Sequence, residues 1–437
     1  MVILHFKSTL LTIPSICVSS FACSFSCYSS SGPPVLHWHQ SFIHRLPTEL
    51  LCCIFLMCGE PSPVASYPRD DHMHRADVDW NHFCQYSRSA VLLGRVCSRW
   101  FTVTRGFPRL WTVFDVGAPF GLDFVALQLC LRHSANLPLS LRIRDYTSLP
   151  SENDLVSKLL KHLMCIVANH AGRWEEISLH VLAVKDILDP LLALPHGAFS
   201  CLARASLITE ERRQPTSDDP IVLLWKAFHS QPSLRVVEWP DIPLNFVDLG
   251  NDPLLKNLTH LGMGAVAQHD LLSLLRHCPL VQVLQASILH RSSNEITLRS
   301  PLTVRLRRLR QLILTGSDDM TAIYSSLVVP ALRRLDLSTT KVQHEAIIDM
   351  LTRSTAHLVM LTLHCSTYEH RDNIAALLQD QSLQQLKILR YDIRTVFPNW
   401  RTDDASYDLS PFTSPGVEFF IDWQDAEDAY KTVTSSL

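Results

Sequence analysis

The residues that could carry out chemistry in this chain are few, and the most regular of them form a glycine pattern, Gly262-Met-Gly-Ala-Val-Ala267. It falls between a predicted strand and a predicted helix, and it matches the Gly-x-Gly-x-x-Ala pattern of loops that bind a dinucleotide. Such loops also need an acidic residue about twenty positions further on to hold the ribose. That region reads Gln285-Ala-Ser-Ile288, so we expect no bound cofactor at this pattern.

A second candidate site is a group of side chains of the types that bind metals. His72, His74, His82 and Cys84 lie close together in a segment rich in Pro, His and Asp. Zinc sites are usually marked by Cys-x2-Cys or His-x3-His pairs, and neither pair is present. The segment therefore favours a solvated loop over a metal site, and we expect no metal.

A third candidate is the basic run Arg305-Leu-Arg-Arg-Leu-Arg310, followed by Arg333 and Arg334. Arginine binds carboxylates and phosphates through two parallel hydrogen bonds, so a patch of this kind could receive an acidic or phosphorylated protein segment. The alternative is that these arginines only cover a solvated edge.

Direct catalysis has no motif to support it in this sequence. No Gly-x-Ser-x-Gly elbow, phosphate-binding Gly-Lys-Ser/Thr loop or His-Glu-x-x-His pair is present. We therefore expect a binding protein and not an enzyme.

The composition is typical of a folded protein with a large core. The chain has 437 residues, of which 47% are hydrophobic and 19% charged, and its net charge is -3. This charge gives no reason to expect a nucleic-acid or membrane-surface partner. No apolar run approaches the length of about twenty residues that spans a membrane. Thirteen cysteines are scattered without a regular framework, and Cys53, Cys97, Cys165 and Cys278 sit in apolar helical patterns. We expect reduced, buried thiols, as in the cytoplasm or nucleus.

The elements that could position a binding site begin after residues 1–42, an apolar leader rich in Ser and Cys. The leader resembles a weakly ordered segment more than a secretory signal, because its only early positive charge is Lys7 and Pro14 interrupts the apolar run. Next come two amphipathic segments. Leu50, Leu51, Ile54 and Phe55 follow helical spacing in the first, and Leu92, Val96, Trp100 and Val103 follow it in the second.

These two segments resemble the F-box family. The chain reads Leu46-Pro-Thr-Glu-Leu-Leu-Cys-Cys-Ile-Phe55, then Val96-Cys-Ser-Arg-Trp100, then Pro108-Arg-Leu-Trp111. It departs from a compact F-box in the insertion 59–88, which is similar to those of F-box-like proteins of mushroom-forming fungi. The resemblance implies a three-helix unit that binds the Skp-type adaptor of a cullin ubiquitin ligase. The matching positions are Leu46, Pro47, Leu50, Ile54, Val96, Cys97 and Trp100. The alternative is that all seven only form the core of a helical hairpin.

The rest of the chain contains a repeated motif of the form Leu-x-x-Leu-x-Leu. Its copies begin at Trp174, Leu202, Leu234, Leu258, Leu309, Leu332, Leu358 and Leu383, with a looser copy at Leu280. The copies are about 22 to 32 residues apart, close to the range of leucine-rich repeats, which they resemble. Predicted helices lie between them, at residues 221–228, 270–277, 320–327, 345–352 and 373–379. The asparagine that normally follows the strand is missing, so the repeats are degenerate. The resemblance predicts a solenoid with a curved parallel sheet.

Alternation along the strands predicts which side chains line the open face of that sheet, because successive residues point to opposite sides. In the four most regular copies this face carries a mixed set of side chains that suits a protein partner. The predicted substrate-binding residues are Gln311, Ile313, Arg334, Asp336, Met360, Thr362, Gln385 and Lys387. The alternative is a solvated face with no binding role.

Taken together, the sequence predicts an α/β fold with four parts: the leader 1–42, an F-box-like unit 43–114 with its insertion 59–88, a repeat array 115–391, and a C-terminal capping unit 392–437. The expected function is substrate recognition for a Skp-cullin-F-box ubiquitin ligase. The alternative is an interaction scaffold that recruits no ligase. The expected partners are a Skp-type adaptor, a cullin bound through it, and a protein substrate.

Overall fold

The structure is a computed structural model, and it describes residues 42–59, 86–117, 121–144, 153–181, 187–209, 219–238, 253–288, 303–316, 319–365, 371–392, 413 and 416–420. The chain divides into two units at Pro47 and Thr48. In the described part of the first unit, a 3-10 turn spans Phe42–Arg45. Every described α-helix and β-strand belongs to the second unit.

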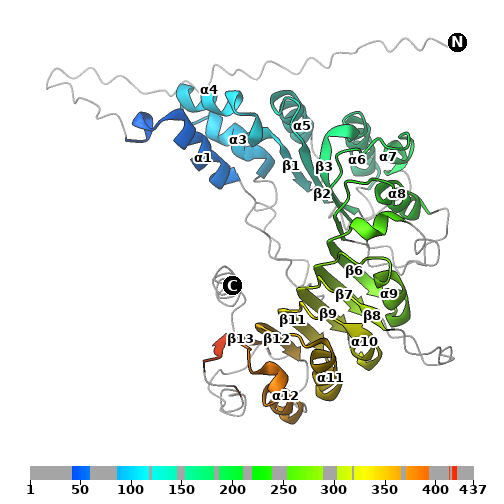
Figure 1. Ribbon diagram of the computed structural model, residues 1–437. Coiled ribbons are helices and arrows are strands. Elements are labelled where there is room, and N and C mark those ends of the chain that lie inside the picture. The colour runs from blue at the N-terminus through cyan, green and yellow to red at the C-terminus, as the bar shows by residue number, and fades with distance from the viewer. Residues whose placement is uncertain are drawn as a thin grey trace, which may run out of the picture. The chain divides into compact units, whose positions relative to one another are not determined.

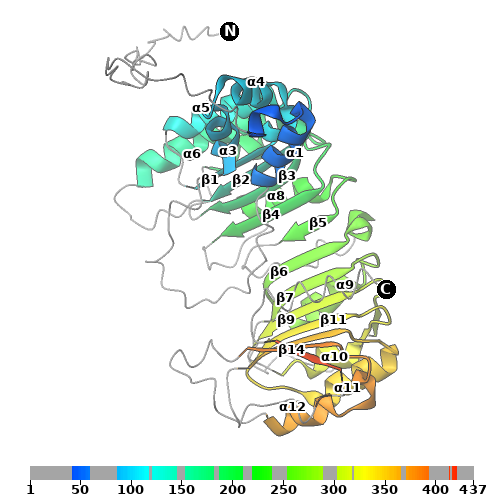
Figure 2. The ribbon, with the colours of Figure 1, turned by 90° about the vertical axis from the view of Figure 1, so that its left-hand side faces the viewer.

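Twelve parallel strands form one sheet, and they are adjacent in the order in which they occur in the chain (Figures 1 and 2). The strands are β1 (Val113–Gly117), β2 (Leu139–Arg144), β3 (Trp174–Val181), β4 (Arg204–Thr209), β5 (Val236–Glu238), β6 (His260–Val266), β7 (Val283–Ile288), β9 (Gln311–Gly316), β11 (Arg334–Thr339), β12 (Met360–Cys365), β13 (Ile388–Asp392) and β14 (Glu418–Phe420). A separate pair of parallel strands is formed by β8 (Val304–Arg305) and β10 (Leu327–Val328). The predicted α/β class with a parallel sheet is confirmed.

Parallel neighbours need a connection that returns to the start of the next strand, and helices occupy most of these connections. The helices are α1 (Thr48–Gly59), α3 (Tyr86–Gly94), α4 (Ser98–Gly106), α5 (Gly121–His133), α6 (Asn153–Ala168), α7 (Asp189–Leu192), α8 (Pro220–His229), α9 (Gln268–Leu275), α10 (Thr321–Ser326), α11 (His344–Ser354) and α12 (Arg371–Leu378). The helices from α8 to α11 lie along one side of the sheet (Figure 1). The five helices predicted between motif copies are all present within a few residues of their expected bounds.

The leucines of the repeated motif form the core between strands and helices. Leu332, Leu335 and Leu337 are completely buried, as are the equivalent leucines of the copies that begin at Leu309 and Leu358. They belong to one continuous cluster with apolar side chains of α10 and α11. Burying one leucine contributes roughly 1.5–3 kcal/mol to the free energy of unfolding, so the strand and the helix of each repeat stabilise each other.

Helix α8 shows how the local sequence produces this packing. The carboxylate of Asp219 accepts a hydrogen bond from the backbone N–H of Ile221 at 2.9 Å, and Pro220 occupies the first turn. Both features are typical of a helix start. Trp225 and Phe228 lie on the buried face, with ring centroids 6.0 Å apart in an edge-to-face arrangement.

The predicted second amphipathic segment, which joined Leu92 and Val103 in one helix, is wrong. Helix α3 ends at Gly94, and the N–H of Arg95 bonds to the carbonyl of Leu92 in a turn. Cys97 is extended, and its thiol accepts from the N–H of Trp100 in the first turn of α4. A cap between the two apolar runs therefore divides them into two helices.

Two copies of the motif are assigned in the wrong register. In the last copy the strand begins at Ile388, which pairs with Met360. Leu389 and Tyr391, and not Leu386 and Ile388, are therefore the equivalents of the core residues Leu361 and Leu363. The looser copy is also displaced by one residue, because Leu284 pairs with Leu261 in the core. Runs of apolar residues in both copies allow more than one alignment to the motif.

The ends of the sheet extend beyond the predicted repeat copies. Strand β1 pairs with β2, and β2 pairs with β3, in the same sheet. The predicted boundary between residues 114 and 115 therefore falls inside β1. Within the predicted capping unit 392–437, β14 pairs with β13 and extends the same sheet. Residues 1–41, residues 60–85 of the insertion, and residues 421–437 of the predicted capping unit lie outside the described residues.

In the part of the chain that the structure describes, no helix combines the length and the apolar character needed to cross a membrane.

Candidate partner-binding surfaces

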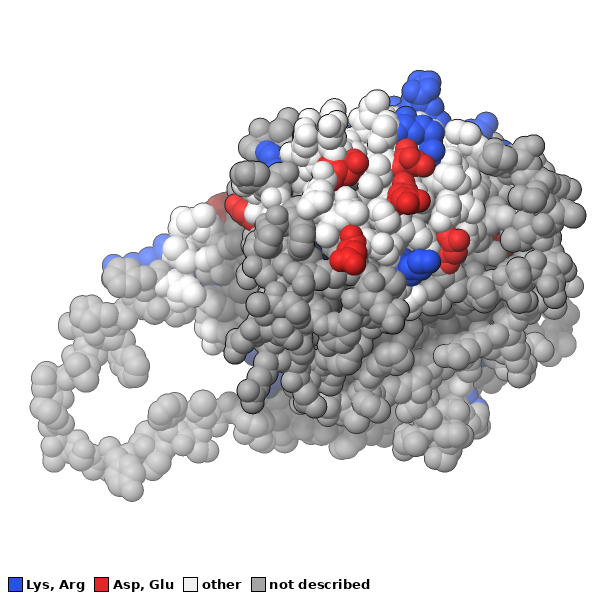
Figure 3. Space-filling view, turned by 90° about the horizontal axis from the view of Figure 1, so that it is seen from below, with Lys and Arg blue, Asp and Glu red and all other residues white. Residues whose placement is uncertain are grey.

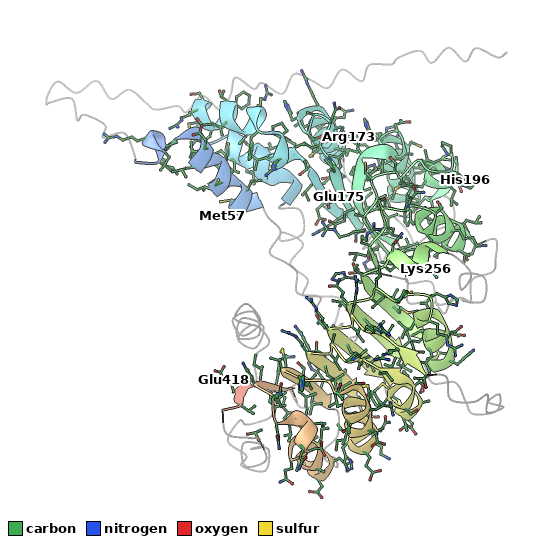
Figure 4. All side chains as sticks on the ribbon, viewed as in Figure 1. Met57, Arg173, Glu175, His196, Lys256 and Glu418 are labelled. Carbon is green, nitrogen blue, oxygen red and sulfur yellow. The ribbon has the colours of Figure 1, made fainter. Side chains whose placement is uncertain are left out.

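Helix α1 has two apolar sides, one buried and one exposed. Leu51 and Phe55, one turn apart, are completely buried. Leu50 and Met57, two turns apart on another side, are exposed, and Met57 lies near the C-terminal end of the helix (Figure 4). One apolar side of α1 therefore packs in the core, and the other apolar side is available to a partner.

Helices α3 and α4 pack together and against α1. The rings of Phe55 and Trp100 meet edge-to-face, with centroids 4.7 Å apart. Gly94 permits the close approach of α4, since a Cβ atom there would lie 3.0 Å from Oγ1 of Thr104 and 3.7 Å from Cδ2 of Phe101. The indole N–H of Trp111 donates to the carbonyl of Thr104 at 2.7 Å. The Pro108–Trp111 turn is therefore fixed to the last turn of α4.

Exposed large apolar side chains concentrate on these helices. The described residues contain seven such side chains, and five of them lie between residues 50 and 101. They are Leu50 (51% exposed), Met57 (69%), Leu92 (53%), Val96 (60%) and Phe101 (44%). We call this set the helical surface. Exposed apolar residues gathered on one small unit are typical of a protein-binding surface.

The predicted adaptor-binding residues take three different roles. Leu50 and Val96 belong to the helical surface. Ile54 and Trp100 are half-buried, and Cys97 caps α4. The other two precede α1 in the first unit, where Leu46 is half-buried and Pro47 exposed. Sequence reasoning missed the rest of the helical surface, although Met57 follows Leu50 by seven residues and so could have been found.

A row of mostly polar residues runs across the sheet on the side opposite the leucine core. Strand pairing places these residues at the same level in adjacent strands, in the order Asp115, Arg142, Ser178, Ser206, Glu238, Gly262, Gln285, Ile313, Asp336, Thr362 and Arg390. We call this side of the sheet the polar face. Adjacent strands lie about 4.8 Å apart, so each residue in the row can contact its neighbours.

In the N-terminal half of the polar face, opposite charges pair across strands. Arg142 contacts Glu176 at 2.9 Å, and Arg204 reaches the other oxygen of the same carboxylate at 3.5 Å. Ser206 donates to Glu238 at 2.8 Å. Desolvation and the charge of Arg204 lower the pKa of His260 below its usual value. This half presents Arg204, Glu238 and His260 to solvent.

In the C-terminal half, the prediction of an open binding face is wrong for four residues. Arg334, Asp336, Met360 and Thr362 are each less than 5% exposed. Nε of Arg334 donates to Asp336 at 2.8 Å, so the two charges compensate each other in a buried site. Side-chain alternation correctly predicted the side of the sheet on which these four residues lie. Because they are buried, a partner in solvent cannot contact them.

The remaining predicted substrate-binding residues differ in position. Gln311 and Ile313 lie on the polar face and are half-buried. Gln385 and Lys387 are exposed, but they precede β13 and so lie outside the row, a result of the wrong register. The accessible part of the polar face therefore lies further toward the N-terminus than expected, from β2 to β9.

The glycine pattern at residues 262–267 is not a loop. Gly262 lies within β6, paired with Glu238 on one side and Gln285 on the other. A Cβ atom at Gly262 would lie 3.1 Å from Cγ of Glu238, so the glycine makes room for that side chain. The strand-loop-helix arrangement that presents N–H groups to a pyrophosphate is absent at these residues.

No group of three or more His, Cys, Asp or Glu residues arranged to hold a metal ion is found among the described ranges. The cluster from His72 to Cys84 falls outside them.

The expectation that the four cysteines in helical patterns are buried is only partly correct. Cys278 is buried, but Cys97 is half-buried and Cys53 and Cys165 are exposed. In α6 the buried side is formed by Leu163, Met164 and Val167, and Cys165 points away from it. The apolar residues next to Cys165 in the sequence therefore did not indicate whether its side chain lies on the buried or the exposed side of α6.

We expect thiol alkylation to separate these environments. Burial raises the pKa of Cys130 and of Cys278 to about 12, so neither thiol ionises at pH 8. Cys165 should react with iodoacetamide in the native protein, whereas Cys130 should react only after unfolding in urea. Peptide mass spectrometry measures both, and equal native rates would contradict the packing of α5.

The chain matches no known protein-family model and no curated protein sequence.

Proposed function

We propose that this protein is a non-catalytic substrate receptor of a Skp-cullin-F-box ubiquitin ligase. In this proposal the helical surface binds a Skp-type adaptor, and the twelve-stranded sheet with its connecting segments binds a protein substrate. Ubiquitin transfer is carried out by the recruited ligase, and the receptor contributes by holding the substrate near it.

The observation that carries the proposal is the exposure of Leu50 and Val96. Both residues occupy F-box positions in the sequence, and both are apolar side chains on the surface of α1 and of the turn before α4. A residue kept only for the core of a helical hairpin would be buried. Exposed positions within the motif favour a partner over a purely internal role.

A second observation supports the receptor half of the proposal. The strands follow chain order in one parallel sheet with helices on one side, which is the arrangement expected of leucine-rich repeats. Such a sheet leaves a broad polar face, and its accessible part carries charges of both signs.

We expect Val96→Asp to abolish capture of a Skp-type adaptor. Removing about 2–3 kcal/mol of apolar contact and placing a charge in the interface should lower recovery at least tenfold. The measurement is co-purification of the coexpressed adaptor with the tagged chain. Because Val96 is 60% exposed, the variant should unfold at the same temperature as the wild type.

The matched control is Val125→Asp on α5, where the valine is 50% exposed. This variant carries the same new charge outside the helical surface and should recover the adaptor normally. Equal recovery by Val96→Asp and the control would contradict the proposal and favour an interaction scaffold that recruits no ligase.

A further inference from the structure

The basic run, which begins in β8 and ends before β9, is anchored in the core while its arginines are exposed to solvent. Val304, Leu306 and Leu309 are buried in the core, and the N–H of Leu306 bonds to the carbonyl of Val328 at 3.0 Å. The arginines alternate with these anchors, and all four are exposed: Arg305, Arg307, Arg308 and Arg310.

Two further basic residues extend this run along the sheet. The N–H of Arg333 donates to the carbonyl of Arg310 at 2.9 Å, the N–H of Val359 to Arg333 at 2.8 Å, and the N–H of Lys387 to Val359 at 2.9 Å. These bonds place Arg310, Arg333 and Lys387 in one row at the amino ends of β9, β11 and β13. We call the four arginines of the run, Arg333 and Lys387 together the basic edge.

The basic edge is not neutralised within the described part of the chain. The ion pairs there use other residues, and no side-chain hydrogen bond involves any of the six. Arg334 differs, because it is buried against Asp336 and is not part of the edge. On the face shown in Figure 3, by contrast, acidic and basic residues are interspersed among uncharged ones.

We propose that the basic edge binds a linear protein segment with two or three negative charges, supplied by Asp, Glu or phosphorylated side chains. This inference rests on the proposed function, because the segment would belong to the substrate. Arginine suits the role, since its planar guanidinium binds a carboxylate or phosphate through two hydrogen bonds.

The dimensions of the edge define the spacing of those charges. Arg310 and Lys387 are separated by three strand steps of about 4.8 Å, or about 14 Å in all. An extended peptide rises about 3.3 Å per residue and presents alternate side chains on one side. Negative charges at positions i, i+2 and i+4 would therefore face the row.

A protein segment fits this surface better than a nucleic acid. The chain has a net charge of -3, and the polar face of the same sheet carries Glu238, which is exposed. The net negative charge of the chain disfavours a long polyanion, whereas a short segment can contact the edge alone.

The test uses the full chain and a fluorescein-labelled peptide, Gly-Glu-Gly-Glu-Gly-Glu-Gly, measured by fluorescence anisotropy. A second peptide carries phosphoserine in place of the central glutamate, and a third has glutamine at all three positions. The variant Arg310→Gln/Arg333→Gln should weaken binding of both charged peptides at least tenfold. The control Arg132→Gln/Lys226→Gln removes the same charge from exposed positions on α5 and α8 and should bind as the wild type does.

Tighter binding of either charged peptide than of the glutamine peptide, lost in the arginine variant alone, supports the inference. Equal binding of the glutamine peptide, or an equal loss in the control, overturns it. Tighter binding of a ten-residue oligothymidine than of both peptides also overturns it. The arginine variant should still capture the Skp-type adaptor, so failure of peptide binding is distinguishable from failure of the proposed function.

Discussion

Replacing Arg334 by methionine should lower the free energy of unfolding by about 3–5 kcal/mol. The guanidinium and the carboxylate of Asp336 are 2.8 Å apart, and both side chains are at most 5% exposed. Methionine fills a similar volume but leaves the carboxylate buried without its positive partner. One oxygen of that carboxylate, Oδ1, already has no hydrogen-bond partner, so little is available to compensate the loss.

Urea unfolding of the wild type and its variants measures this effect. Asp336→Leu alone should also destabilise the chain, whereas the double variant Arg334→Met/Asp336→Leu should regain much of the stability, because an apolar pair needs no charge compensation. The matched control is Arg204→Met. Its guanidinium lies 3.5 Å from Glu176 but is 54% exposed, so the expected loss is below about 1 kcal/mol.

Additive losses in the double variant would show that the two charges do not depend on each other. An equal loss in the Arg204 control would show that burial does not distinguish the two ion pairs. Either result would contradict the assignment of Arg334 and Asp336 as a buried pair whose charges compensate each other.

The sheet could be predicted from the sequence because its leucines repeat at a spacing that local geometry explains. Leu335 and Leu337 are two residues apart, as required of side chains that point to one side of a strand. The helices between copies were equally clear. Register was less certain where apolar residues are abundant, as at Leu386, Ile388 and Leu389, since several alignments satisfy the same pattern.

Access to the polar face could not be predicted in the same way. Alternation determines the side to which Met360 and Thr362 point, but accessibility depends on atoms remote in the sequence, and both residues are completely buried. Only Leu50 and Val96 of the helical surface were predicted from the sequence, for a related reason. Leu50 and Leu51 are neighbours of the same type, and tertiary packing alone buries one and exposes the other.

A buried histidine should make the protein sensitive to mild acid. His229 lies at the end of α8, 1% exposed, with its ring 5.6 Å from that of Trp225. Burial lowers the pKa of His229 to about 4 in the folded protein, against about 6.5 in an unfolded chain. The unfolded state therefore binds a proton first as the pH falls. The destabilising effect is absent above about pH 7, and stability decreases as the pH falls from about 6.5 towards 4.

At pH 4.5 this difference in pKa corresponds to about 2.5 kcal/mol of stability lost relative to about pH 7.5. His229→Phe keeps an aromatic ring beside Trp225 and removes the titration, so the loss between the two pH values should shrink by that amount in urea unfolding. His196, exposed after α7 (Figure 4), provides the control His196→Phe, whose acid loss should equal that of the wild type. The three proteins contain the same carboxyl groups, so the comparison isolates the histidine. An unchanged loss in His229→Phe would mean that the pKa of the ring is the same in the folded and unfolded states, which is incompatible with its burial at the end of α8.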